Sequence, residues 1–129
     1  MHHPALIRRH IAAARRVDEF ITWLAGSGDE LVDAALLLGG STWGRVAANV
    51  VARASQGHDP SDLLPQLRRL RRLLQLELAA DLASEEAERF MALDPDDPRA
   101  DSARICAEAL DHGIRALELV RPVLGREAA

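Results

Sequence analysis

Apolar residues recur at helical spacing along most of the chain. The clearest case is the first segment, whose apolar positions are Leu6, Ile7, Ile11, Ala14, Val17, Ile21 and Leu24. This spacing places them on one face of an amphipathic α-helix, with charged residues on the other. No stretch alternates with the period of a β-strand, and Ala and Leu are far more frequent than β-branched residues. The sequence therefore predicts an all-α protein.

Glycine and proline divide this pattern into segments. Five stretches are predicted to be helical: residues 4–25, 27–38, 41–54, a long helix starting at 60 or 65, and 98–121. A glycine follows each of the first three, Asp97 can cap the last, and Pro122 should end or kink it. We therefore predict a compact bundle of five or six helices. It forms a single domain over residues 1–129, with frayed ends at about 1–3 and 123–129.

Composition fits one globular domain. Apolar residues make up 48% and charged residues 28% of 129 positions, which is enough for one hydrophobic core. No apolar run is long enough to span a membrane, and the first ten residues carry charges where a signal peptide needs apolar ones. The single cysteine, Cys106, lies on the apolar face of the last helix and is expected to be buried. We expect a cytoplasmic protein that does not associate with membranes.

Four arginines in five positions mark the long helix. They are Arg68, Arg69, Arg71 and Arg72, and all sixteen basic residues of the chain are arginine. The leucines of this helix share one face, at Leu63, Leu67, Leu70, Leu74 and Leu78. The arginines fall opposite, with Arg71 at the edge, which is the pattern of a solvated face. The net charge of −4 argues against broad, non-specific binding of nucleic acid.

The acids that follow this arginine cluster are poorly placed for one continuous helix. Cations near the start and carboxylates near the end both oppose the helix dipole. A break near Ser84, which would cap a new helix, removes much of this conflict. Alternatively, one long helix pairs with an antiparallel copy of itself, so that Arg71 lies opposite Glu85 and Arg68 lies opposite Glu88. The second arrangement predicts a homodimer.

Residues 29–50 carry another pattern, "DELVDAALLLGGSTWGRVAANV", with a helix followed by Gly40, Ser41, Thr42 and Trp43, then Val46-Ala47. This pattern resembles the first part of many bacterial helix-turn-helix domains. The resemblance implies DNA binding by the helix that follows. It covers about twenty residues, because "NVVARASQG" continues as helix where the family has a short turn. No residue is carried over as a base contact, and only Arg45 and Arg53 are candidates for touching phosphate.

Two pairs of acids suggest a metal-dependent enzyme. Glu85 and Glu88, then Glu108 and Asp111, are each three residues apart and lie on different predicted helices. This arrangement resembles the carboxylates of all-helical nucleotide pyrophosphohydrolases of the MazG type. The resemblance implies magnesium held between two helices and a polyphosphate substrate. The family's leading acid is replaced by Ser84.

The function that best fits these features is a non-enzymatic protein-protein interaction or regulatory domain that self-associates. The residues expected to carry the interaction are the four arginines of the cluster, Glu85, Glu88 and Trp23. Trp23 lies opposite the main apolar face of its helix, where it either anchors a partner or packs under the turn at Gly26. We predict no catalytic residue, metal site or cofactor. DNA binding through residues 29–56 and magnesium-dependent nucleotide hydrolysis are the first and second alternatives.

Overall fold

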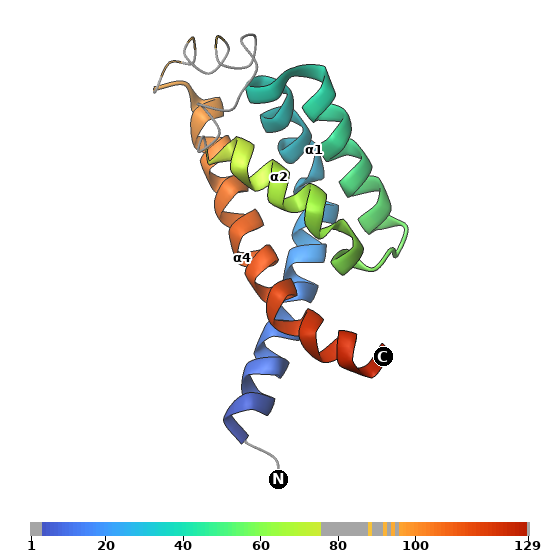
Figure 1. Ribbon diagram of the computed structural model, residues 1–129. Helices are drawn as coiled ribbons and strands as arrows, with labels where there is room; N and C mark the ends of the chain where they lie inside the picture. Colours follow the sequence, from blue (N-terminus) through green and yellow to red (C-terminus); the bar gives the residue numbers. More distant parts are fainter. Residues whose placement is uncertain (1–3, 76–87, 89–91, 93, 95, 129) are drawn as a thin grey trace.

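The computed structural model describes residues 4–75, 88, 92, 94 and 96–128. Its elements are the α-helices α1 (Pro4–Ser55), α2 (Leu64–Leu74) and α4 (Pro98–Ala128), with the 3-10 helix η1 (Pro60–Leu63) before α2. No strand occurs in these ranges. The prediction of an all-α protein is confirmed, and the described helices pack into one compact unit (Figure 1).

The predicted number of helices, five or six, is wrong, since the described residues form three α-helices and one 3-10 turn. The first three predicted helices are one element, α1, because its backbone leaves helical dihedral angles only at two kinks. These kinks lie at Ser27 (φ −120°, ψ 17°) and Gly40 (φ 78°, ψ −166°), close to the predicted boundaries. Gly40 adopts a positive φ that glycine reaches without steric penalty, and this lets α1 reverse direction there.

The start of α2 follows the later of the two predicted positions. Asp59 caps the short η1, since its Oδ1 accepts a hydrogen bond from the Ser61 backbone N–H at 3.0 Å. Pro65 then lies in the first turn of α2, where its missing N–H leaves no helical bond unmade. The helix ends at Leu74. The break expected near Ser84 and the last leucine of the predicted stripe, Leu78, lie outside the described residues.

α4 begins as predicted at Pro98. The Asp97 carboxylate accepts a hydrogen bond from the Arg99 backbone N–H at 2.9 Å, which satisfies one free donor of the first turn. The helix does not end at Pro122, because helical backbone continues to Ala128. Its direction does change in this C-terminal part, as Figure 1 shows in red.

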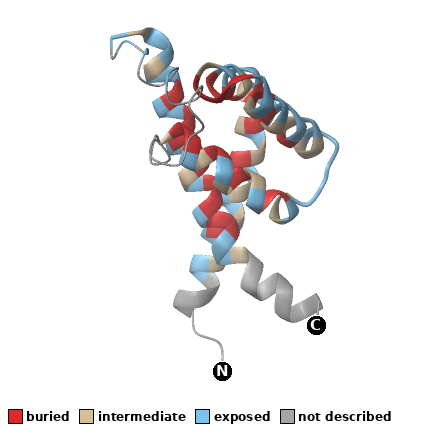
Figure 2. Ribbon diagram, turned by 45° about the horizontal axis from the view of Figure 1, so that its top comes forward, coloured by how far each residue is buried: buried red, intermediate tan, exposed pale blue. Residues whose placement is uncertain are grey.

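The core lies where α1, α2 and α4 meet, and each of the three contacts the other two. α2 contributes five buried leucines, at Leu64, Leu67, Leu70, Leu73 and Leu74. Each fully buried leucine stabilises the fold by about 1.5–3 kcal/mol. Figure 2 shows the buried residues on the inward sides of all three helices. No helix among the described residues is long and apolar enough to cross a membrane.

Candidate interaction face

The arginine cluster of α2 lies against acids of the same chain. Arg71 Nη1 donates a hydrogen bond to Asp111 Oδ1 of α4 at 3.1 Å. The other oxygen of Asp111 lies 3.0 Å from Arg115 Nε. The Arg71 and Asp111 side chains are only 23% and 24% exposed. The pair is therefore a half-buried bridge between α2 and α4, where water weakens the attraction less than at an open surface.

Two more arginines of the cluster have intrachain contacts. Arg68 Nη2 lies 3.6 Å from Glu118 Oε1 of α4, in a pair that is open to water. The Arg69 guanidinium stands 5.3 Å from the ring centroid of Trp43 in α1, which is a cation–π contact. Arg72 lines a shallow depression beside Arg71 and Arg115. The cluster thus helps to hold α2 against α4 and α1.

The acids predicted to face these arginines in a homodimer were Glu85 and Glu88. Glu85 lies outside the described residues, and Glu88 is exposed. A partner copy would have to displace Asp111 from Arg71 and Glu118 from Arg68. The homodimer stays a prediction, and in it the acids of the partner copy would compete with Asp111 and Glu118 for the arginines.

A second group of arginines lies near the start of α1: Arg8, Arg9, Arg15 and Arg16, here called the α1 arginine face. Arg8 and Arg15, and likewise Arg9 and Arg16, are two helical turns apart and therefore point to the same side of α1. All four are exposed. None has an ion pair or a hydrogen bond from its side chain to any residue that the structure describes. This is the opposite of what the sequence suggested, since the conspicuous cluster is engaged and the less conspicuous one is unpaired.

The α1 arginine face leads into a groove between α1 and α4, here called the Trp23 groove. Its volume is about 340 Å³, and its walls are Arg16, Glu19, Phe20, Trp23, Ala109, His112 and Gly113. Trp23 is half-buried and stacks on Phe20, with ring centroids 6.0 Å apart and planes 12° from parallel. The Phe20 ring fills the space that a side chain at Gly113 would need, so glycine permits the close approach of the two helices. Trp23 therefore both packs against the core and lines an open groove.

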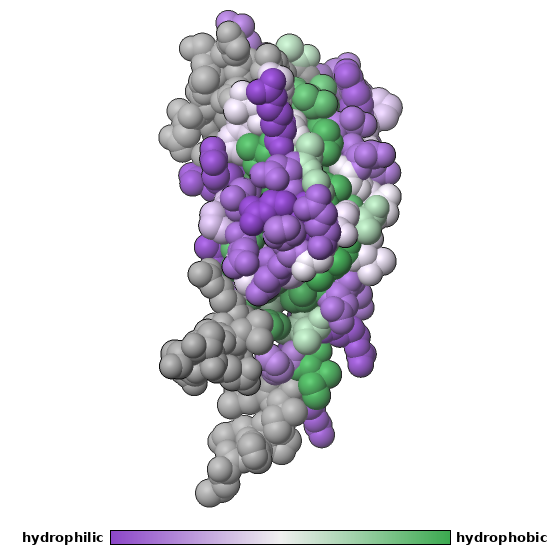
Figure 3. Space-filling model, turned by 90° about the vertical axis from the view of Figure 1, so that its right-hand side faces the viewer, coloured by the Kyte–Doolittle hydropathy of each residue, from purple (hydrophilic) through white to green (hydrophobic). Residues whose placement is uncertain are grey.

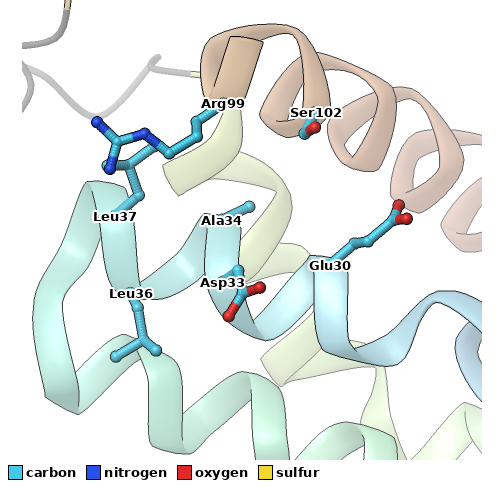
Figure 4. Close-up of a pocket in the computed structure, with 7 residues that line it drawn as sticks. All are labelled: Glu30, Asp33, Ala34, Leu36, Leu37, Arg99 and Ser102. Atoms are coloured by element: carbon cyan, nitrogen blue, oxygen red, sulfur yellow. The ribbon is translucent and has the colours of Figure 1, made fainter. Parts of the chain in front are cut away.

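A larger groove of about 450 Å³ lies between the middle of α1 and the start of α4 (Figure 4). Its polar groups are Glu30, Asp33, Arg99 and Ser102, beside the apolar Ala34, Leu36 and Leu37. Figure 4 shows Arg99 reaching over Leu37. The guanidinium of Arg99 is held by Asp97, with Nη2 and Oδ2 at 2.7 Å, and this contact raises the arginine pKa. The groove therefore offers two exposed carboxylates and one arginine that is already neutralised.

The cysteine is not poised for chemistry. Cys106 is buried, as predicted, and desolvation raises the pKa of its thiol to about 11, with a smaller contribution from the negative charge of Glu30. A thiol with such a pKa is almost entirely protonated at neutral pH and is a poor nucleophile.

The carboxylates assigned to metal by the pyrophosphohydrolase resemblance do not form a cluster in the described part of the chain. Glu108 and Asp111 line one groove together with His112, but Asp111 is neutralised by Arg71 and Arg115. No group of three or more His, Cys, Asp or Glu side chains among the described residues is arranged to hold a metal ion. The contribution of Glu85 to such a site lies outside those residues.

The helix-turn-helix resemblance can be followed for the length it covers. The segment after Gly40 continues as helix to Ser55, as the sequence predicted, and does not turn early. α2 then follows, but its Arg68 and Arg71 face α4 and its Arg69 covers Trp43. The side of the molecule formed by the third segment of α1 is mainly hydrophilic beside a narrow hydrophobic strip (Figure 3). DNA binding by residues 29–56 stays untested.

Sequence reasoning missed the α1 arginine face, although a signal for it was present. Arg8 and Arg9 have no acid within four residues on either side, so no local helical pair can neutralise them. The arginines of the α2 cluster are closer together in the sequence than those of the α1 arginine face. The two groups differ in whether acidic residues are available to pair with them.

Comparison with known proteins adds no relative from which a role could be transferred. No protein-family model matches the chain, and neither a curated protein nor a solved structure matches it.

Proposed function

We propose that this chain is a non-enzymatic helical interaction domain that binds a protein partner on the α1 arginine face and the adjoining Trp23 groove. The observation that carries the proposal is the contrast between the two arginine groups. Arg71 of α2 is half-buried against Asp111, whereas Arg8, Arg9, Arg15 and Arg16 are exposed and have no ion-pair partner among the described residues.

The composition of this surface supports binding to protein. Tryptophan and arginine are the residue types that most often dominate the energy of protein-protein interfaces, particularly where a pocket excludes water. Trp23 offers a half-buried ring at the edge of a groove, and Arg16 lines the same groove. A side chain of the partner that enters the groove would be desolvated against Trp23. Neighbouring residues of the partner would then contact the arginines of α1.

Other parts of the prediction are retained in this proposal. Self-association through Arg68 and Arg71 remains a hypothesis that must overcome their pairing with Glu118 and Asp111. We also propose that the domain acts in the cytoplasm.

The proposal is tested by quantitative affinity purification from the cells that express the protein. Three baits are compared: the wild-type chain, the double variant Arg9→Glu/Arg16→Glu, and the control Arg45→Glu/Arg104→Glu, which reverses two exposed arginines elsewhere. We expect at least one protein to be recovered with the wild type and the control and to be lost from the α1 variant. Identical recovery with all three baits would contradict the proposal.

A further inference from the structure

We infer that the partner of this face is an acidic helical segment of another protein, which lies along the α1 arginine face and places one apolar side chain in the Trp23 groove. This inference rests on the proposed function and adds the chemistry of the partner to it. It is carried by the charge, the dimensions and the electrostatic setting of α1.

The first observation is a row of uncompensated positive charge. Four exposed arginines occur within nine residues, and the only acids within four sequence positions of any of them are Asp18 and Glu19, at the C-terminal end of the row. Neither acid forms an ion pair with them in the structure. The chain as a whole has a net charge of −4, so this row is a local departure from its overall sign. A surface of this kind attracts carboxylates and orients them during encounter.

The second observation is that two of these charges, on Arg8 and Arg9, lie close to the unfavourable end of their helix. The first turn of α1 contains no acidic residue, and Arg8 and Arg9 follow in its second turn. Cations at a helix N-terminus oppose the helix dipole, so they destabilise the free protein slightly. Carboxylates from a partner would offset both the mutual repulsion of the arginines and their interaction with the dipole.

The third observation is the distance between the charges and the groove. Arg8 and Trp23 lie on the same side of an uninterrupted part of α1, since the first kink is at Ser27. Their separation of fifteen positions corresponds to about 22 Å along the helix. A partner helix of about four turns spans this length, with acids along one face and an apolar residue near one end. Recognition of this kind, a helix laid against a helical surface with one or two anchors, is common among interaction domains.

The groove selects among anionic partners. Its walls include the stacked rings of Phe20 and Trp23 and the side chain of Ala109, so the end of the binding face has an apolar part beside the polar Glu19 and His112. Duplex DNA presents phosphate along its whole length and would leave this part of the face unused. A lipid surface needs a broad apolar face beside the cations. In this region Ala13, Phe20 and Leu24 are buried against the bundle, and Ile11, which is 53% exposed, is a single apolar side chain beside the arginines and not a broad face. An acidic protein segment can contact both the arginines and the groove, because it carries carboxylates and apolar side chains together.

The inference is tested with a defined probe. The probe is a synthetic helical peptide of about sixteen residues, with Glu along one face and a single Leu near one end. Two control peptides replace every Glu by Gln or the Leu by Ala. The protein carries Trp43→Phe, so that Trp23 is its one remaining tryptophan and its emission reports binding at the groove. Circular dichroism confirms that each variant is folded.

We expect the acidic peptide to shift Trp23 emission and to lose affinity about tenfold or more in Arg9→Glu/Arg16→Glu. The Gln peptide should bind at least tenfold more weakly than the acidic one. Rising salt should weaken the two peptides that carry Glu and leave the Gln peptide nearly unaffected. The Ala peptide should still bind but should change the Trp23 emission less.

Equal binding of the acidic and Gln peptides would overturn the inference. Tighter binding of a DNA duplex or of anionic phospholipid vesicles than of the acidic peptide, measured on the same protein, would also overturn it. If affinity purification identifies a protein that depends on Arg9 and Arg16 while the acidic peptide fails to bind, then the proposed function stands and the inferred chemistry of the partner fails. If both experiments are negative, the proposed function fails as well.

Discussion

Arg71 of α2 donates a hydrogen bond to Asp111 of α4 across 3.1 Å, although the two residues are 40 positions apart in the chain. The pair links α2 to α4, and Asp111 also contacts Arg115 at 3.0 Å. The α2 arginine cluster, which the sequence predicts to be a binding surface, therefore contributes contacts within the fold. The arginines that we propose for binding are those near the start of α1.

Removal of Asp111 should destabilise the fold. Asp111→Ala leaves Arg71 half-buried without its partner, and we expect the free energy of unfolding to fall by about 1–3 kcal/mol. Urea denaturation at neutral pH measures the change. The matched control is Glu118→Ala, whose pair with Arg68 is 42–43% exposed and should contribute less than about 1 kcal/mol. Equal losses in the two variants would show that the Arg71–Asp111 bridge has no special structural role.

Gly113 should tolerate no larger residue without loss of stability. A methyl group at this position overlaps the ring of Phe20, so Gly113→Ala should lower the free energy of unfolding by about 1–3 kcal/mol and disturb the Phe20–Trp23 stack. The same substitution at Gly26 meets no atom within 4 Å, and should stabilise α1 by about 0.5–1 kcal/mol through helix propensity. Thermal unfolding followed by circular dichroism tests both variants. A stable Gly113→Ala protein would mean that α1 and α4 do not approach this closely.

The Cys106 thiol should react slowly until the protein unfolds. Its pKa of about 11 leaves about one thiolate in a thousand at pH 8. Burial favours the neutral thiol in the folded state, so the side chain contributes fully to stability below the ordinary pKa of a cysteine. As pH rises from that value towards about 11, the unfolded chain can ionise its thiol and the folded one cannot, so the stability falls. Reaction with an aromatic disulfide reagent at pH 8, with and without urea, measures the difference. Fast reaction of the folded protein would show that Cys106 is accessible and ionised.

The cap of α4 should make a contribution to stability that disappears in acid. Hydrogen bonds from the side chain and the backbone of Arg99 lower the pKa of Asp97 below 3.8. An ionised carboxylate with a lowered pKa stabilises the folded state above its ordinary pKa, and this contribution is lost as pH falls through the lower value. Asp97→Ala should therefore be less stable than the wild type at pH 6, and the difference should shrink below pH 4. The neighbouring Asp96→Ala is the control, and a difference that does not depend on pH would contradict the account.

The sequence predicted the helices better than their number or their contacts. Helical periodicity and the glycines located the kinks of α1 at Ser27 and Gly40, because both signals are local. Whether a boundary separates two helices or only bends one depends on a single residue's dihedral angles, which composition does not reveal. The burial of Cys106 and of Leu67, Leu70 and Leu74 followed from periodicity, whereas Leu64 and Leu73 are buried in α2 although they lie outside the predicted stripe.

The proposed binding face could not be found in the same way. The partners of Arg68 and Arg71 lie on α4, far away in the chain, so only the packed structure shows that these arginines are engaged. Likewise, the lack of partners for the α1 arginine face becomes visible only when the surrounding helices are in place. The absence of acids near Arg8 and Arg9 was the one local sign of it.

The most direct test of this account compares the two arginine groups in one titration. The acidic peptide is added to the Trp43→Phe protein, to its Arg9→Glu/Arg16→Glu variant and to its Arg68→Glu/Arg69→Glu variant, and Trp23 emission gives each affinity. The account predicts that reversal in α1 weakens binding about tenfold or more, while reversal in α2 leaves affinity nearly unchanged and lowers stability instead. If affinity falls only when the charges of Arg68 and Arg69 are reversed, the account is contradicted, because the binding face would then lie on the "RRLRR" cluster of α2.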